Sequence, residues 1–393
     1  MGETRFEKAK QEDFDDVIDF GDFVFSHGHG PSDFISLLPK LYKPQYFMNG
    51  IHYIAREGGK IKAVVGAYPL EMEFPGAVSL PGRGIGMVSV HPRSRFKGYM
   101  KALMNMAVED MKKDGMVFSC LGGQRQRYEY FGYTPTGTNY QFSFNESNII
   151  HTLGKEWKSS LNINIVNTGD TKTLDKIIEI HTAKAARYHR GREELFDILS
   201  SWYAKIFALT EGEHFKGYII CKPNTYDVME INLTEPSLMC EAIGLLLRYR
   251  KEKNDQETVM VAAGPHEIEK IANLSRFAEH CRQDAAYQFN VFNFKQLAEP
   301  LMKIKAKQKI LSEGSFILKI EGTKGGAYEL TSRGGQTWIV ETTAAPNLIL
   351  DTLEAARFLF SPVSAVTNQK IRESLFLQSL LPLPLFFEYI DGI

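Results

Sequence analysis

The sequence has few cysteines and no long apolar run. Four cysteines occur in 393 residues, and Cys120, Cys221, Cys240 and Cys281 lack the spacing of metal ligands. Most of them lie in apolar segments, which favours small buried thiols in a reducing compartment. No segment reaches the roughly twenty apolar residues that cross a bilayer, and residues 1–8 lack the apolar region of a signal peptide. We therefore expect a cytoplasmic protein without a membrane partner.

The sequence also lacks an excess of charge of either sign. Its 46 Lys and Arg residues face 47 Asp and Glu residues, for a net charge of −1 at pH 7. Proteins that follow a nucleic-acid backbone usually carry a large basic excess. We therefore expect no nucleic-acid partner. Hydrophobic residues make up 44% of the chain, which is enough for two or three domain cores at this length.

A metal site is not expected either. His27 and His29 stand two residues apart in the glycine-rich segment 26–31, but the sequence shows no third ligand. The same segment is expected to end an acidic helix that runs from Glu12 to Phe25. We predict no bound metal.

The segment Val88–Lys101 is typical of a strand that runs into a basic, glycine-containing turn and then a helix. The helix is expected to begin near Tyr99 and to bury Met100, Leu103, Met104, Ala107 and Met111. A helix N-terminus presents free N–H groups and the positive end of the peptide dipoles, so it stabilises an anion. Gly98 lets a phosphate approach the backbone, and Arg93, Arg95, Lys97 and Lys101 add charge. These features predict a pyrophosphate site; the alternative is a turn whose glycine and lysines serve only capping and solubility.

A second strand, expected at 116–121, is followed by Tyr128-Glu-Tyr-Phe131-Gly132-Tyr133. This order of strand, turn, helix, strand and short helix resembles the GNAT N-acetyltransferases. In that family the turn reads Arg/Gln-x-x-Gly-x-Gly/Ala. Arg95 and Gly98 match this pattern, and Met100 stands in its last position.

We expect three domains, at residues 1–147, 148–288 and 289–393. The first contains an antiparallel meander with strands at 51–55, 60–74 and 84–90 and turns at 58–59, 75–76 and 81–82. The second repeats its rhythm, with helices at 172–187, 192–203 and 237–253. Where the first domain has its basic turn, the second has Thr234-Glu235-Pro236. Because the glutamate would repel a phosphate, we interpret this block as a structural GNAT-like repeat without a cofactor.

The third domain is expected to contain a helix at 294–306 and strands at 316–321, 327–332 and 336–342. Asn347 is then expected to cap a helix at 348–360. This pattern resembles the sterol-carrier-protein-like domain. Two hypotheses stay open for it, a compact α+β module and a carrier of lipid or acyl chains.

These three blocks together resemble the enhanced intracellular survival (Eis) family of acetyltransferases over the whole chain. The strongest local matches are Val90-x-Pro92-x-x-Arg95-x-x-Gly98 and Tyr128-x-x-Phe131-Gly132-Tyr133. In that family the residue at the position of Met100 is often a larger apolar one, and a second arginine often stands where this chain has Phe96. The resemblance implies an α+β fold with two tandem GNAT folds and a sterol-carrier-protein-like domain. It also implies a homo-oligomer, a trimer or hexamer.

The resemblance further implies a substrate, acetyl-CoA, and residues that hold it. These are the backbone of Val88, Ser89 and Val90 and the turn formed by Arg95, Phe96, Lys97, Gly98, Tyr99 and Met100. A backbone N–H near Val88–Val90 would stabilise the oxyanion. Tyr128 would be the general acid that protonates the leaving thiolate, or else a tyrosine packed on the cofactor.

The general base implied by the resemblance is the terminal carboxylate of Ile393. The tail 383–393 is rich in Leu, Phe, Tyr and Ile, which is typical of a docked segment. A tail docked only for packing is the alternative.

We therefore predict an acetyl-CoA-dependent N-acetyltransferase. Its acceptor would be a small-molecule primary amine such as an aminoglycoside, a polyamine or a lysine-like compound, which attacks directly in a ternary complex. The alternative is a lipid- or acyl-chain-binding protein in which the GNAT folds are a scaffold.

Overall fold

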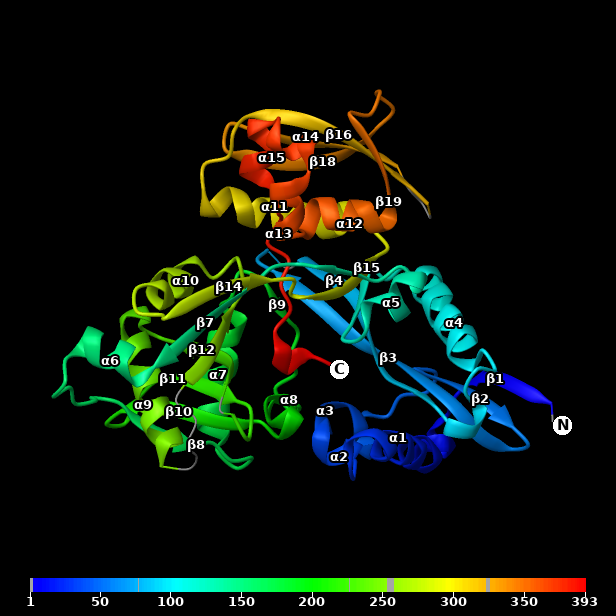
Figure 1. The fold of residues 1–393 in the computed structure, drawn as a ribbon, viewed down its shortest axis with the longest axis horizontal. Helices are drawn as coiled ribbons and strands as arrows, with labels where there is room; N and C mark the ends of the chain where they lie inside the picture. The colour runs from blue at the N-terminus through cyan, green and yellow to red at the C-terminus, as the bar shows by residue number, and fades with distance from the viewer. Residues whose placement is uncertain (1–2, 77, 226, 253–257, 323–325) are drawn as a thin grey trace.

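The computed structural model describes residues 3–393 apart from 77, 226, 253–257 and 323–325. The strands described form three separate β-sheets with helices packed against them. Figure 1 shows one lobe for each sheet, with the C-terminal segment descending from the third lobe between the other two. This architecture confirms the predicted α+β class. Within the described ranges, every helix is too short or too polar to cross a bilayer.

The first sheet is mainly antiparallel, with the order β1-β2-β3-β4-β5-β15-β6 and with β9 beside β3. Helix α1 (Phe14–His29), α2 (Phe34–Leu37) and α3 (Pro39–Tyr42) cover one face, and α4 (Tyr99–Lys113) covers the other. The short α5 (Arg125–Tyr128) follows β5. The strands are β1 (Thr4–Lys8), β2 (His52–Glu57), β3 (Lys60–Phe74), β4 (Val78–Val90), β5 (Phe118–Leu121), β6 (Thr134–Thr136), β9 (Arg187–Tyr188) and β15 (Tyr287–Val291).

Two boundaries in this lobe differ from the sequence predictions. Helix α1 does not end at Phe25 but continues to His29, and Gly30, with a φ of 83°, ends it before Pro31. Pro81 and Gly82 do not form a turn, because both lie within β4. An added Cβ at Gly82 would collide with the ring of Phe118 on β5, so this glycine permits close packing rather than a change of direction.

The second sheet has the order β14-β7-β13-β12-β11-β10-β8. Its parallel strands β12 and β13 are joined by α9 (Met239–Lys251), just as the parallel strands β4 and β5 are joined by α4. The remaining helices are α6 (Glu146–Leu153), α7 (Thr171–Thr182), α8 (Leu195–Ser200) and α10 (Ile268–Ser275). The strands are β7 (Asn139–Asn145), β8 (Asn162–Ile165), β10 (Lys205–Glu211), β11 (His214–Cys221), β12 (Val228–Leu233), β13 (Thr258–Ala263) and β14 (His280–Asp284).

The first two helices that the sequence predicted for this lobe, at 172–187 and 192–203, are shorter than expected. The helix predicted at 172–187 ends at Thr182, because Arg187 and Tyr188 form β9 and pair with β3 of the first sheet. The helix predicted at 192–203 is confined to α8, and Trp202 and Tyr203 after it have φ angles of 63° and 56°. Neither residue can continue a helix in that conformation.

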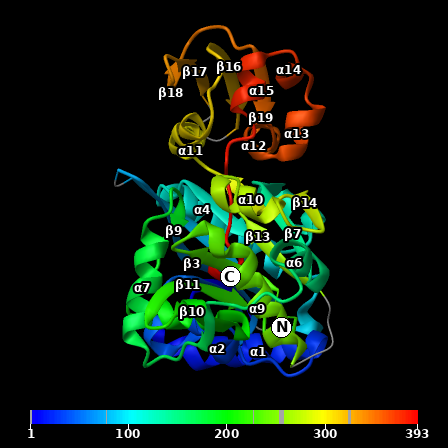
Figure 2. The same cartoon turned by 90° about the vertical axis from the view of Figure 1, so that its left-hand side faces the viewer.

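The third sheet has the order β18-β17-β16-β19. Its strands are β16 (Gly314–Glu321), β17 (Ala327–Arg333), β18 (Gln336–Thr342) and β19 (Leu348–Asp351). The helices are α11 (Phe294–Gln308), α12 (Thr352–Phe360), α13 (Pro362–Thr367), α14 (Gln369–Arg372) and α15 (Leu375–Leu380). Figure 2 shows this lobe standing above the other two.

The predicted helix at 348–360 is wrong in its first turn. Leu348–Asp351 is a strand that pairs in parallel with β16, and the helix begins at Thr352. Asp351 is the N-cap and accepts a hydrogen bond from the backbone N–H of Glu354. Asn347 instead accepts a hydrogen bond from the N–H of Ile317.

Among the described residues, strand pairing crosses the expected domain boundaries at three places. β9 lies within the expected second domain but pairs with β3 in the first sheet. β7 precedes residue 147 but pairs with β13 and β14 in the second sheet. β15 spans the expected boundary at 288 and lies between β5 and β6 in the first sheet. The first and second sheets thus each contain a strand from beyond the expected boundary, and the division at 147 and 288 stays a prediction.

Candidate functional site

β4 has a short pairing with its parallel neighbour β5, and it carries a β-bulge against β3 further along the strand. β4 pairs with β5 at Gly82, Arg83 and Gly84. Its register against β3 then shifts between the pairs at Gly86 and Ser89, and Met87 has a left-handed φ of 49°. A bulge bends and twists its strand. The backbone of Val88–Val90 therefore diverges from β5, and these residues line an open groove.

This groove has a volume of about 950 Å³ and ends at the N-terminus of α4. All of the predicted cofactor residues line it except Lys97. The Lys97 ammonium turns away to Glu57 on β2 and lies 3.0 and 2.9 Å from its carboxylate oxygens. The groove is lined by Val24, Phe25, His27, Gly28, Val88, Ser89, Val90, Ser94, Arg95, Phe96, Gly98, Tyr99, Met100, Lys101, Arg127, Tyr130 and Phe131.

The groove is positively charged where the helix begins. Gly98 is the N-cap of α4, has a φ of 80° and provides no side-chain cap, so the first N–H groups of the helix stay available to a ligand. Arg95, Lys101 and Arg127 add three cationic side chains to the lining. Peptide N–H groups, the helix dipole and these cations together favour a phosphate-bearing ligand.

Several lining residues were not predicted as site residues from the sequence. The α1 wall, with Val24 and Phe25, comes from a helix that was considered only for its acidic face. Arg127 and Tyr130 flank Tyr128, and the Lys101 ammonium lies 4.5 Å from the centre of the Tyr130 ring. The paired arginines Arg125 and Arg127 after the second strand were the available signal for this basic wall.

Tyr128 is buried directly behind this wall. It packs in the cluster that includes Leu103 and Tyr133, and its ring lies so close to Gly123 that a Cβ there would touch it. The residues beside it, Arg127 and Tyr130, line the groove. Burial raises the pKa of the Tyr128 phenol, which Arg127 partly opposes, so the phenol keeps its proton at neutral pH.

The C-terminal residue, Ile393, packs against β4, the strand that also contributes Val88–Val90 to the groove. The Ile393 side chain covers Gly84 and Gly86, and a Cβ at either glycine would overlap it. Ile393 also contacts the apolar cluster that contains Tyr68 and Met87. Gly84 and Gly86 lie on the same face of β4, because residues two apart in a strand share a face. The tail is therefore docked against β4, beside the bulge that opens the groove.

Lys40 on α3 holds the tail from the side of the first lobe. Its ammonium donates a hydrogen bond of 2.6 Å to the carbonyl of Ile390. Burial lowers the pKa of Lys40 to about 7, while the nearby Asp391 carboxylate opposes that shift. This group therefore loses its proton in the folded chain near neutral pH.

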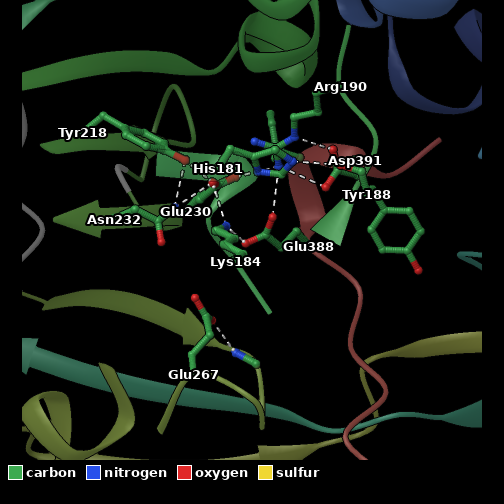
Figure 3. Close-up of polar contacts among 12 residues, drawn as sticks. His181, Lys184, Tyr188, Arg190, Tyr218, Glu230, Asn232, Glu267, Glu388 and Asp391 are labelled. Carbon is green, nitrogen blue, oxygen red and sulfur yellow. Dashed lines mark hydrogen bonds and ion pairs between the residues drawn. The ribbon is translucent and has the colours of Figure 1, made fainter. Parts of the chain in front are cut away.

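One cluster of ligand-type side chains lies apart from the groove. His181, Glu230 and Glu388 bring their ligand atoms within 4.8 Å of one another. The Lys184 ammonium, however, lies 3.0 Å from Glu230 Oε1 and 2.5 Å from Glu388 Oε1. Figure 3 shows this ammonium between the two carboxylates, so a protein cation already balances their charge.

Comparison with known proteins identifies a known family for the part of the chain that forms the groove. Residues 5–136 match the family model of the acetyltransferase (GNAT) domain. The chain thus contains a GNAT acetyltransferase domain, and it includes the bulge, the groove and the basic turn. No curated protein matches the chain.

Solved structures resemble the chain over nearly its full length. A GCN5-related N-acetyltransferase from Anabaena variabilis has 15% identity and a TM-score of 0.68, with 100% of both chains covered. A probable N-acyltransferase of unknown function from Enterococcus faecalis has 16% identity and a TM-score of 0.65, with 90% of this chain and 89% of that chain covered. Eis1 from Mycobacterium abscessus has 13% identity and a TM-score of 0.56, with 91% and 88% covered. At these identities the similarity shows a shared fold.

The buried amine of Lys40 predicts a pH-dependent stability. Between pH about 7 and about 10.5, the unfolded chain binds a proton that the folded chain lacks. The contribution of Lys40 to the free energy of unfolding should therefore rise with pH in this window, by at most about 1.4 kcal/mol per pH unit. Lys40→Met removes this contribution. The melting temperature of the wild type minus that of the variant should increase from pH 7 to pH 10. A difference that stays constant with pH would contradict a buried neutral amine at Lys40.

Proposed function

We propose that the chain is an acetyl-CoA-dependent N-acetyltransferase with its active site in the groove of the first lobe. The observation that carries this proposal is the opening of β4 at Met87 into a groove that ends at the uncapped N-terminus of α4. This arrangement lies within the residues that match the acetyltransferase family model.

The groove offers two kinds of contact for the long, phosphate-bearing acetyl-CoA. The backbone of Val88–Val90 supplies N–H and C=O groups that can pair with an extended amide chain, as a neighbouring strand would. The N–H groups of the turn 95–101, together with Arg95, Lys101 and Arg127, suit a pyrophosphate. The Lys97 side chain is assigned no role in this contact, because it is paired with Glu57.

The proposed reaction is a direct transfer of the acetyl group from acetyl-CoA to the amine. A neutral amine nitrogen attacks the thioester carbonyl, a C–N bond forms and the C–S bond breaks. A backbone N–H of Val88–Val90 stabilises the oxyanion that develops. The thiolate takes its proton from Tyr128, whose buried phenol is protonated at neutral pH.

The proton that the amine loses goes to a base, and the proposed base is the carboxylate of Ile393. Its support is position, since Ile393 lies on Gly84 and Gly86 of the strand that opens into the groove. The tail would thus bring a carboxylate to this strand, and no side chain of the sheet itself would be needed as the base. A tail that is docked only for packing remains the alternative.

The rest of the proposed Eis-like organisation concerns the other two lobes. In the second, Glu235 of the turn before α9 pairs with Lys216 at 2.6 Å, so its turn carries no free cation for a phosphate. This supports a structural role for that lobe. In the third, Phe316, Leu318 and Leu330 pack against Leu301 and Phe358. We propose a sterol-carrier-like domain for this lobe, and the trimeric or hexameric assembly stays a proposal.

Acetyl-CoA binding and amine-dependent thiol release test the proposed function. The wild-type protein should bind acetyl-CoA in calorimetry and release free CoA thiol with an amine from a panel of aminoglycosides, polyamines and lysine peptides. Arg95→Ala removes a cation at the phosphate end and should weaken binding about tenfold, the effect of losing about 1.4 kcal/mol of charge-assisted hydrogen bonding.

Lys113→Ala is the matched control, because Lys113 is an exposed cation at the opposite end of the same helix. It should leave the affinity unchanged. Equal losses in both variants would indicate a general charge effect, and the absence of any binding or thiol release in wild type would refute the proposal.

Tyr128→Phe separates the chemical role from a packing role. The substitution keeps the ring in its cluster and removes only the hydroxyl, so kcat should fall by about 100-fold or more if the phenol is the acid. The affinity for acetyl-CoA should stay within about twofold. The rate of thiol release at saturating amine gives kcat. An unchanged kcat would show that Tyr128 serves only in packing.

A further inference from the structure

A buried ionic network, distinct from the groove, joins the second lobe to the C-terminal tail. Arg190 follows β9, and its guanidinium is fully buried. Around it lie Glu230 of β12 and two tail residues, Glu388 and Asp391. Figure 3 shows these side chains converging from the second sheet and from the red C-terminal segment.

Arg190 makes a two-point contact with Asp391. Its Nε donates to Oδ1 at 2.8 Å and its Nη2 donates to Oδ2 at 3.0 Å. Nη2 also lies 2.7 Å from Glu230 Oε2 and 3.0 Å from Glu388 Oε2, so its two hydrogens are shared among three carboxylates. A planar guanidinium that holds a carboxylate by two bonds fixes its direction as well as its distance.

The network is anchored firmly on the side of the second sheet. Glu230 also accepts hydrogen bonds from Tyr218 and from Asn232. Lys184 bridges Glu230 to Glu388, at 3.0 and 2.5 Å. The guanidinium that holds the tail is therefore itself held by a buried carboxylate with several partners, and it has little freedom to follow a moving tail.

A buried ionic network contributes little net free energy to holding the tail in place. Removing charges from water costs several kcal/mol for each ion, and well-packed apolar residues often hold two surfaces as well as a buried ion pair does. The tail already has apolar anchors, since Phe387 stacks on Tyr287 at 4.5 Å and Ile390 is fully buried. What the ions add is register, because a tail shifted by one residue would leave Glu388 and Asp391 without their partners.

Fixing the position of Asp391 also restricts the position of Ile393, the proposed base. Ile393 follows Asp391 by two residues and lies on Gly84 and Gly86 of β4. One residue before Asp391, the carbonyl of Ile390 is held by Lys40 of the first lobe. The six terminal residues are thus fixed by the second lobe at one end and seated on the first lobe at the other.

We propose that Arg190 is a positioning residue for the acetyltransferase reaction, and that the second lobe places Ile393 in the active site of the first. Arg190 touches neither substrate and acts through Asp391 and the tail. The proposal rests on the proposed function and gives the lobe that lacks a cofactor turn a part in catalysis.

Two substitutions at Arg190 test this proposal. Arg190→Met keeps the apolar stem and removes the guanidinium; kcat should fall about 100-fold, the cost of misplacing a reacting group by about 1 Å. The Kd for acetyl-CoA should stay within about twofold, because the groove at α4 is untouched. Arg190→Lys restores the charge without the planar fork and should recover only part of kcat.

Arg192→Met is the matched control, since Arg192 lies two residues further along and pairs at the surface with Asp175. It should change neither quantity. Release of residues by carboxypeptidase measures the tail independently of catalysis, and it should be faster in Arg190→Met than in wild type. If Arg190→Met fails to fold, Asp391→Asn weakens the same contact with the same expected split between kcat and Kd.

The outcomes are distinguishable from a failure of the proposed function. A wild-type protein that releases no thiol with any amine refutes the function itself, and with it a positioning role in that reaction. An active wild type whose Arg190→Met variant retains kcat within twofold refutes the positioning role alone. A parallel loss of kcat and acetyl-CoA affinity also refutes it, because that pattern indicates general unfolding.

Discussion

The divergence of β4 from β5 after Gly84 is the constraint on which the proposed site depends. The bulge at Met87 turns the backbone of Val88–Val90 away from its neighbour and leads the chain into the turn before α4. Peptide groups that a continuous sheet would pair with each other thereby become available to a ligand. The same strand, on the glycines just before the bulge, seats Ile393. The groove and the seat of the tail thus share one strand.

The proposed role of the second lobe is to hold the C-terminal tail rather than a cofactor. Its parallel pair β12 and β13 and helix α9 repeat the layout of the first lobe, but Glu235 and Lys216 neutralise each other at its turn. Its sheet instead supplies Glu230, which holds Arg190 and through it the tail. We propose that conformational specificity, rather than stability, is the reason that these ions are buried.

Local signals in the sequence predicted the parts of the fold that depend on nearby residues. Gly98 and the apolar face of α4 predicted the turn and the helix that follows it. Partners that lie far away in sequence could not be predicted in this way. Nothing near Lys97 shows that Glu57 neutralises it, and nothing near Leu348 shows that β16 has a free edge for a strand. Gly84 and Gly86 were expected only as residues of a strand, because the residue that needs their missing side chains, Ile393, is far away in the sequence. Arg190 lies in no motif.

Hydrogen exchange in the presence and absence of CoA tests the proposed site most directly. Backbone amides of residues 88–90 and 95–101 should exchange more slowly when CoA is bound, because they would pair with the ligand. Amides at the corresponding turn of the second lobe, 234–239, should be unaffected. Protection at 234–239, or CoA binding without protection at 88–90 and 95–101, would contradict a single site at the opening of β4.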